Sequence, residues 1–155
     1  MSLKTWQSLK LFLIAALVLS LQTAVLKELI NFEINLVLVS IICIACFTSL
    51  NLSILTGIFF VLVINLLTYN SSFYWIYLLL AIVANQFNPK QLEDKFLVAV
   101  FYCALFSPVF ELIYTPFKDN LLHKCIMATL INTLALIPMY FLIKFLIKEK
   151  KKRAY

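Results

Sequence analysis

Few side chains in this 155-residue chain could take part in chemistry, and they are scattered along it. Cys43 and Cys46 have the CxxC spacing of redox and zinc sites, but they lie in an apolar stretch without the polar loop or flanking basic groups of such sites. His123 is the one histidine, and a single imidazole does not form the usual metal site. The chain has no GxSxG or HExxH motif, and its one glycine excludes a glycine-rich phosphate loop. We therefore expect no enzyme, no metal and no cofactor.

Glu111 is the one acidic residue that the sequence places within an apolar helix, about one turn from the end of that helix. A carboxylate in such a helix is costly and indicates a function by default. Its helical face is small, polar and kinked by proline: Ala104, Ser107, Pro108, Glu111 and Thr115. Two interpretations stay open, a contact with the bundle or a partner helix, and an interfacial anchor that pairs with Lys118 or Lys124. Proton-coupled transport is a weaker third, because no second polar relay accompanies Glu111.

The helices that must carry these residues are indicated by a long stretch without charge. No charged residue occurs from Ile34 to Pro89, a run of 56 residues. A charge at the centre of a bilayer costs about 2.5–3.5 kcal/mol on insertion scales, and one helical crossing needs about 20 apolar residues. Hydrophobic residues make up 64% of the chain and charged residues 13%. The sequence therefore predicts an all-α, polytopic integral membrane protein with one domain, residues 1–155.

Weak and strong breaks in the apolar pattern divide the chain into six transmembrane helices. Thr48, Ser49 and Asn51 make a weak break, and Tyr69–Ser72 makes a stronger one with turn-type residues. The predicted helices are Leu9–Leu26, Ile34–Phe47, Leu52–Thr68, Phe73–Phe87, Phe96–Tyr114 and Cys125–Ile147, followed by a basic tail over 148–155. The second helix is short for a full crossing, so it either tilts little or thins the bilayer.

The distribution of lysine predicts that both termini are cytoplasmic. Six crossings place ten basic residues on the cytoplasmic side and only Lys27, Lys118 and Lys124 outside, which agrees with the positive-inside rule, whereas five crossings do not. The net charge is +6, and six of the basic residues fall within Lys144–Arg153, beside the expected lipid surface. The charge therefore does not indicate binding of nucleic acid. A composition rich in Ile, Asn and Lys suggests an AT-rich bacterial genome and hence the bacterial cytoplasmic (inner) membrane.

Four of the predicted helices carry small or amide side chains at helical spacing. Such seams allow helices to approach closely, and asparagine can hydrogen-bond across them. The seams contain Ala16, Ser20 and Ala24 in the first helix, Ser53, Gly57 and Asn65 in the third, Ala81, Ala84 and Asn85 in the fourth, and Cys125, Ala128, Asn132, Ala135 and Met139 in the sixth. We expect internal packing for most of them and a partner contact for at least one. Asn132 in particular should hydrogen-bond to another helix.

The order of these features resembles the rod shape-determining MreD family over roughly Leu9–Lys150. The first helix ends in Leu19-Ser20-Leu21-Gln22, and Asn31-Phe32-Glu33-Ile34-Asn35-Leu36 leads into the second. The third contains Leu55-Thr56-Gly57 and, further on, Asn65. The fifth has its late acidic residue, Glu111, and the sixth runs from Asn132 to Pro138 and then to Lys144 and Lys148.

The resemblance implies a non-enzymatic subunit of the bacterial cell-elongation machinery. Such a subunit would bind MreC and, through it, the MreB filament, beside a RodA-type glycosyltransferase and its class B penicillin-binding transpeptidase. It also implies a six-helix fold similar to the substrate-binding subunits of energy-coupling-factor transporters. That relation supplies the alternative function, a membrane subunit that binds a small solute such as a vitamin. This alternative requires an outward pocket lined by polar groups.

Overall fold

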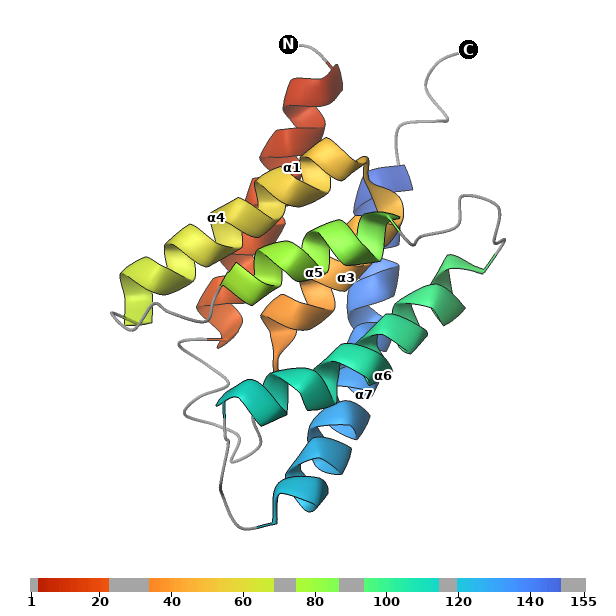
Figure 1. Ribbon diagram of the computed structural model, residues 1–155. Helices are drawn as coiled ribbons and strands as arrows, with labels where there is room; N and C mark the ends of the chain where they lie inside the picture. The colour runs from red at the N-terminus through yellow and green to blue at the C-terminus, as the bar shows by residue number, and fades with distance from the viewer. Residues whose placement is uncertain (1–2, 23–33, 69–74, 87–93, 115–119, 149–155) are drawn as a thin grey trace.

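The computed structural model describes residues 3–22, 34–68, 75–86, 94–114 and 120–148 (Figure 1). Within these ranges the chain is all-helical and has six helices and no strand. The helices are α1 (Leu3–Ser20), α3 (Leu36–Phe47), α4 (Leu50–Thr68), α5 (Trp75–Gln86), α6 (Lys95–Tyr114) and α7 (Leu121–Lys148). The prediction of an all-α chain with six helices is therefore confirmed for the described residues.

The helix ends differ from the prediction mainly in the first and the last helix. α1 begins at Leu3, six residues before the apolar stretch, and gives way to a π-helical turn at Leu21 and Gln22. α7 begins at Leu121, so that His123 and Lys124 lie in its first turn and not in a loop. The predicted ends follow the apolar run, which marks the segment that lipid would favour. The helix itself can continue beyond that run through Lys and Gln, because both are good helix formers. The predicted residues beyond Gln22 lie outside the described part.

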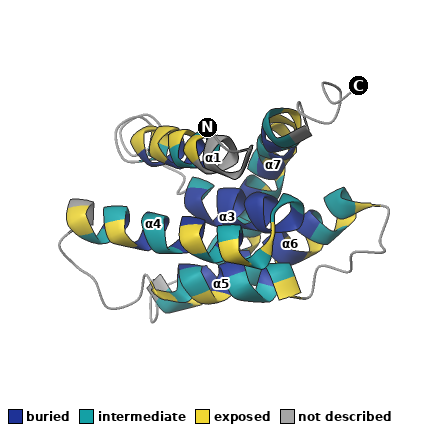
Figure 2. Cartoon of the chain, turned by 90° about the horizontal axis from the view of Figure 1, so that it is seen from above, coloured by how far each residue is buried: buried dark blue, intermediate teal, exposed yellow. Residues whose placement is uncertain are grey.

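α3 is the central helix of the bundle. Ten of its twelve residues are buried, and it packs against each of the other five helices (Figure 2). Its sequence, LVLVSIICIACF, has no polar face, and a helix that is hydrophobic all round must be covered on every side. Cys43 and Cys46, the CxxC pair, are both buried here, consistent with packing residues. The short second helix of the prediction is thus the core of the fold.

Side chains from two neighbouring helices cap the C-terminal end of α3. The Asn85 amide on α5 donates to the carbonyl oxygens of Ala45 (2.9 Å) and Thr48 (3.0 Å). The Lys95 ammonium on α6 donates to the carbonyl of Cys46 (3.1 Å) and lies 5.5 Å from the centre of the Phe47 ring. The last carbonyls of a helix have no partner within the helix, so a buried end needs such donors. Asn85 therefore has an internal role.

Small side chains allow α4 and α5 to pack closely. Gly57 on α4 faces Ala81 on α5, and a Cβ added at Gly57 would lie 3.2 Å from the Ala81 Cβ. One turn earlier, the Ser53 hydroxyl donates to the Ala81 carbonyl at 3.2 Å. On the other side of α4, Phe59 meets Phe12 of α1 edge to face, with the ring centroids 4.8 Å apart. The seam predicted around Gly57 is an internal contact.

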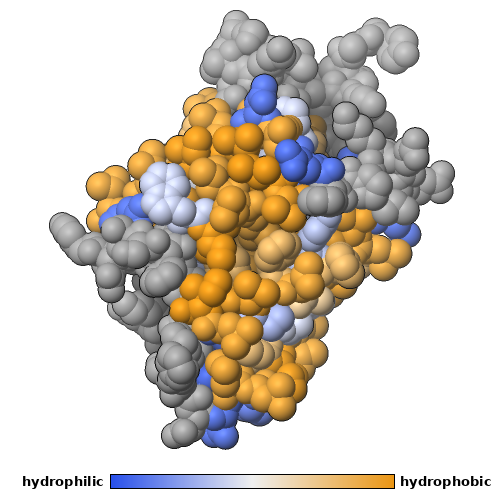
Figure 3. Space-filling view, in the orientation of Figure 1, coloured by the Kyte–Doolittle hydropathy of each residue, from blue (hydrophilic) through white to orange (hydrophobic). Residues whose placement is uncertain are grey.

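The outer surface of the bundle is strongly apolar. Large hydrophobic side chains point outward along every helix except α3, including Leu13 of α1 (64% exposed), Leu66 of α4 (75%) and Leu122 of α7 (77%). Hydrophobic side chains cover the middle of the face seen in Figure 3. An apolar surface of this extent is unusual for a soluble monomer and marks contact with a membrane or other proteins.

Candidate functional site

A buried polar cluster lies at the N-terminal end of α3. Its centre is Asn132 of α7, which is 3% exposed. The side-chain oxygen of Asn132 accepts a hydrogen bond from the backbone N–H of Asn35 (2.8 Å), and its amide nitrogen donates to the Ser107 hydroxyl on α6 (3.2 Å). The hydrogen bond expected between Asn132 and another helix is therefore present. One residue joins α7, α6 and the start of α3.

Asn35, Tyr77 and Gln22 complete this cluster. The side chain of Asn35 caps α3 by accepting from the Leu38 N–H (3.0 Å), and its amide nitrogen lies 2.8 Å from the Tyr77 hydroxyl of α5. Gln22, beyond α1, accepts from the Val37 N–H at 3.0 Å. Asparagine is among the preferred N-cap residues because its side chain satisfies N–H groups of the first turn. The first turn of α3 is thus held by segments from across the chain.

The chemistry of this cluster is that of neutral donors and acceptors. Amides and hydroxyls are paired with one another and with backbone N–H groups at 2.8–3.2 Å. Such a network fixes helices relative to one another, and its loss leaves buried groups unpaired. Across the part of the chain that the structure describes, no group of three His, Cys, Asp or Glu side chains is placed to hold a metal ion. This arrangement can hold the helices of the bundle in fixed positions relative to one another.

The residues singled out from the sequence separate into buried and outward positions. Gly57, Asn85, Ser107 and Asn132 make the internal contacts described above. Ala16, Ser20 and Pro138 are exposed, and the Ser20 hydroxyl donates to the Ala16 carbonyl of its own helix at 2.9 Å. Ala24 lies outside the described residues. The outward positions are the ones left for lipid or a partner helix.

Glu111 is half-buried on α6, one turn beyond Pro108. Pro108 is also half-buried, and its carbonyl lies 3.9 Å from the Cys125 sulfur of α7. Glu111 is therefore partly shielded by the bundle. Its role in assembly stays a prediction.

Asn65 on α4 differs from Asn132 although both are asparagines in apolar helices. The Asn65 side-chain oxygen is buried and has no hydrogen-bond partner among the described residues. A buried, unpaired carbonyl costs about 1–3 kcal/mol. Asn65 therefore does not stabilise the isolated chain as Asn132 does.

Sequence reasoning did not select Asn35, Gln22 and Tyr77 as site residues. Asn35 had a usable signal, because an Asn directly before a hydrophobic run is a typical N-cap. Gln22 and Tyr77 had none, because their partners are 15 and 42 residues away in the chain. Only the fold brings them to the start of α3.

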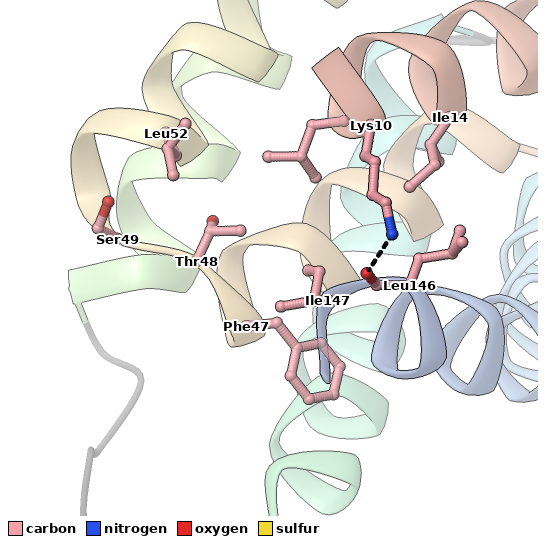
Figure 4. A pocket seen from close by; sticks show the side chains of 9 residues that line it. Lys10, Ile14, Phe47, Thr48, Ser49, Leu52, Leu146 and Ile147 are labelled. Carbon is pink, nitrogen blue, oxygen red and sulfur yellow. Dashed lines mark hydrogen bonds between the residues drawn. The ribbon is translucent and has the colours of Figure 1, made fainter. Parts of the chain in front are cut away.

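A cavity of about 180 Å³ lies at the opposite end of α3 (Figure 4). It is enclosed by α1, the end of α3, the start of α4 and the end of α7, through Lys10, Leu11, Ile14, Phe47, Thr48, Ser49, Leu52, Leu146 and Ile147. The Lys10 ammonium donates to the Leu146 carbonyl at 3.5 Å. The first half of α1 and the last turn of α7 therefore lie at the same end of the bundle (Figure 1).

Two helices, over Lys95–Ile113 and Leu121–Ile147, are long and apolar enough to cross a membrane. The other four helices contain shorter apolar stretches. Comparisons with protein-family models, with curated proteins and with solved structures return no match for this chain.

Proposed function

We propose that the chain is a multi-pass membrane protein with six crossings and both termini on the cytoplasmic side. Its two longest helices support this, because only 28% of the residues in the most apolar stretch of α6, and 22% in that of α7, are buried. A core helix of a soluble protein would be mostly covered, whereas these helices expose large apolar side chains such as Phe101 and Leu134. The shared end of α1 and α7 also agrees with an even number of crossings.

The capping of α3 supports the same placement. Twelve residues give a helix about 18 Å long, which is shorter than the roughly 30 Å hydrocarbon core. Both ends of α3 would then lie at a depth where water cannot satisfy the backbone. Non-helical backbone at membrane depth is tolerated only where protein buries it. Asn35 and Gln22 at one end, with Asn85 and Lys95 at the other, supply the partners that this requires.

The topology is tested by cysteine accessibility in whole cells. In a background where Cys43, Cys46, Cys103 and Cys125 are replaced by serine or alanine, single cysteines at positions 2 and 154 should resist a membrane-impermeant maleimide until the cells are opened. A cysteine at position 119, in the segment before α7, should react in intact cells. Labelling of position 2 or 154 from outside would exclude two cytoplasmic termini.

Within this class we propose a non-enzymatic scaffold of the cell-elongation machinery, similar to the MreD family. The observation that carries the proposal is the closed interior of the bundle, in which the central helix is capped at both ends and the polar groups around Asn132 bind one another. A bundle of this kind presents a fixed outer surface to other membrane helices. The proposed partners are MreC and, through it, MreB, together with a RodA-type glycosyltransferase and its transpeptidase.

The alternative, a subunit that binds a small solute from outside, receives less support. It calls for an open polar pocket at the end away from the termini. At that end the polar side chains of Asn35, Tyr77 and Asn132 are occupied by hydrogen bonds to one another or to neighbouring groups. The described cavity lies at the other end, beside Lys10.

Co-purification with MreC from the same genome tests the scaffold proposal. We expect the detergent-solubilised chain to recover MreC, and an unrelated bitopic protein with the same tag to be left behind. Glu111→Leu should reduce recovery about five-fold, equivalent to roughly 1 kcal/mol of an interhelical polar contact. Glu111→Gln separates loss of charge from loss of shape.

The controls keep the result interpretable. Leu112→Ala, at the exposed neighbouring position, should leave recovery unchanged. Absence of MreC from the wild-type eluate, with both proteins present in the membrane fraction, would overturn the scaffold proposal. Recovery that stays at the parent level with both Glu111→Gln and Glu111→Leu would reduce Glu111 to an interfacial anchor.

A further inference from the structure

The cavity beside Lys10 has mostly apolar walls, the hydroxyl side chains of Thr48 and Ser49, and one cationic side chain. Its apolar lining includes Ile14 of α1, Phe47 at the end of α3, and Leu146 and Ile147 of α7 (Figure 4). A fully enclosed apolar cavity of about 150 Å³ holds a benzene molecule. A cavity of about 180 Å³ is therefore large enough for a segment of hydrocarbon chain.

A cleft between α1 and α4 adjoins the cavity but has no room for a water molecule. Leu11 and Leu52 line both spaces, and Phe12, Leu55 and Thr56 line only the cleft. The usable space is therefore the cavity itself, and its largely apolar lining suits the end of an acyl chain better than a compact polar solute.

The Lys10 ammonium supplies positive charge to this cavity. Lys10 is half-buried, and its ammonium group lies between α1 and α7, 3.5 Å from the Leu146 carbonyl. An ammonium group has three donors, so it can bind a helix carbonyl and an anion together. In the sequence, Ile147 is followed by Lys148, Lys150, Lys151, Lys152 and Arg153, with Glu149 as the one acid among them. Among the described residues, Lys10 is the cation that lines the cavity.

We propose that this cavity is a binding site for an anionic phospholipid of the cytoplasmic leaflet. The headgroup phosphate pairs with the Lys10 ammonium, and part of one acyl chain enters the cavity between α1, α3, α4 and α7. A basic side chain at the surface of an anionic membrane contributes about 1 kcal/mol. The inference rests on the proposed membrane placement and not on the elongation complex.

Lipid titration of the purified full-length chain tests the site. After delipidation in detergent, native mass spectrometry should show phosphatidylglycerol bound about five-fold more tightly than phosphatidylcholine with the same acyl chains. Lys10→Gln should remove this preference and Lys10→Arg should keep it. Lys124→Gln, in the first turn of α7 at the other end of the bundle, is the matched control and should behave as the parent.

The apolar half of the site is tested separately. Ile14→Trp fills the cavity and retains Lys10, so it should weaken the binding of both lipids several-fold. A preference for phosphatidylglycerol that survives Lys10→Gln would overturn the site. So would a preference that disappears only when four basic residues of the tail are changed to Gln together: Lys150, Lys151, Lys152 and Arg153. Glycerol phosphate that binds as tightly as the lipid would assign the cavity to a small anion.

The membrane placement is checked in the same preparations. Release of the chain from membranes by alkaline carbonate would contradict the placement itself. A chain that resists carbonate but shows no lipid preference would contradict only the lipid site.

Discussion

Asn132→Leu should lower the free energy of unfolding in detergent by about 1–3 kcal/mol, because two buried groups lose their partner. The backbone N–H of Asn35 would lose its acceptor at 2.8 Å, and the Ser107 hydroxyl would lose its donor at 3.2 Å. Leucine has a similar volume, so the change removes hydrogen bonds and leaves little cavity. Far-ultraviolet circular dichroism during denaturant titration measures the loss.

Asn65→Leu is the matched control, because its side-chain oxygen is buried without a partner among the described residues. Removing an unsatisfied amide should leave the stability unchanged or raise it. The two substitutions are identical in chemistry and differ only in whether the fold supplies partners. Equal destabilisation by both would show that the hydrogen bonds around Asn132 do not hold the bundle together.

The contrast between Asn132 and Asn65 also shows how far the sequence could be interpreted. Both residues stand in apolar helices with small neighbours, and both were expected to lie at packing or partner surfaces. The helix class and number follow from apolar runs and turn residues, which act locally. Which asparagine finds a donor or acceptor depends on the register between helices, and no local signal encodes that register.

The position of α3 could be anticipated only in part. Its sequence is apolar on every face, which predicts burial either in lipid or in protein. The prediction of a short crossing helix did not choose between them, and the fold surrounds α3 with five helices. Asn85 and Lys95, which the sequence assigned to a seam and to a loop, reach the carbonyls at the end of α3. Capping by residues from distant segments depends on the finished fold and has no local pattern.

The basic residues illustrate one sequence signal with two structural uses. The asymmetry of lysine supports the orientation of the chain, and a topogenic charge needs no particular partner. Lys10 and Lys95 nevertheless donate to helix carbonyls at 3.5 and 3.1 Å, and Lys144 lies 5.6 Å from the Tyr140 ring. Lysine stems cover apolar surface while the ammonium reaches polar atoms, so lysines that the sequence counts only for orientation also make specific contacts within the bundle.

Gly57→Leu should be among the most damaging single substitutions, with an expected loss of about 3 kcal/mol in the free energy of unfolding, because the α4–α5 contact has no space for a side chain. A Cβ at this position would already lie 3.2 Å from the Ala81 Cβ and 3.4 Å from a Leu78 methyl group. The further atoms of leucine would separate the helices and break the 3.2 Å hydrogen bond from Ser53 to the Ala81 carbonyl. Ala104→Leu, at an exposed small residue of α6, is the matched control and should be tolerated.

Gly57→Ala provides the finer test of the same contact. Alanine gains about 1 kcal/mol of helix propensity over glycine, which opposes the strain of a 3.2 Å contact, so the net change should be close to zero. Combining Gly57→Ala with Ala81→Gly moves the single methyl group to the other helix and should relieve that strain. A double-mutant cycle measures the coupling, and we expect the pair to be more stable than the sum of the single changes by at least 0.5 kcal/mol, roughly the lower limit for residues in contact. Strict additivity, or a Gly57→Leu chain as stable as the parent, would mean that α4 and α5 do not meet through Gly57 and Ala81.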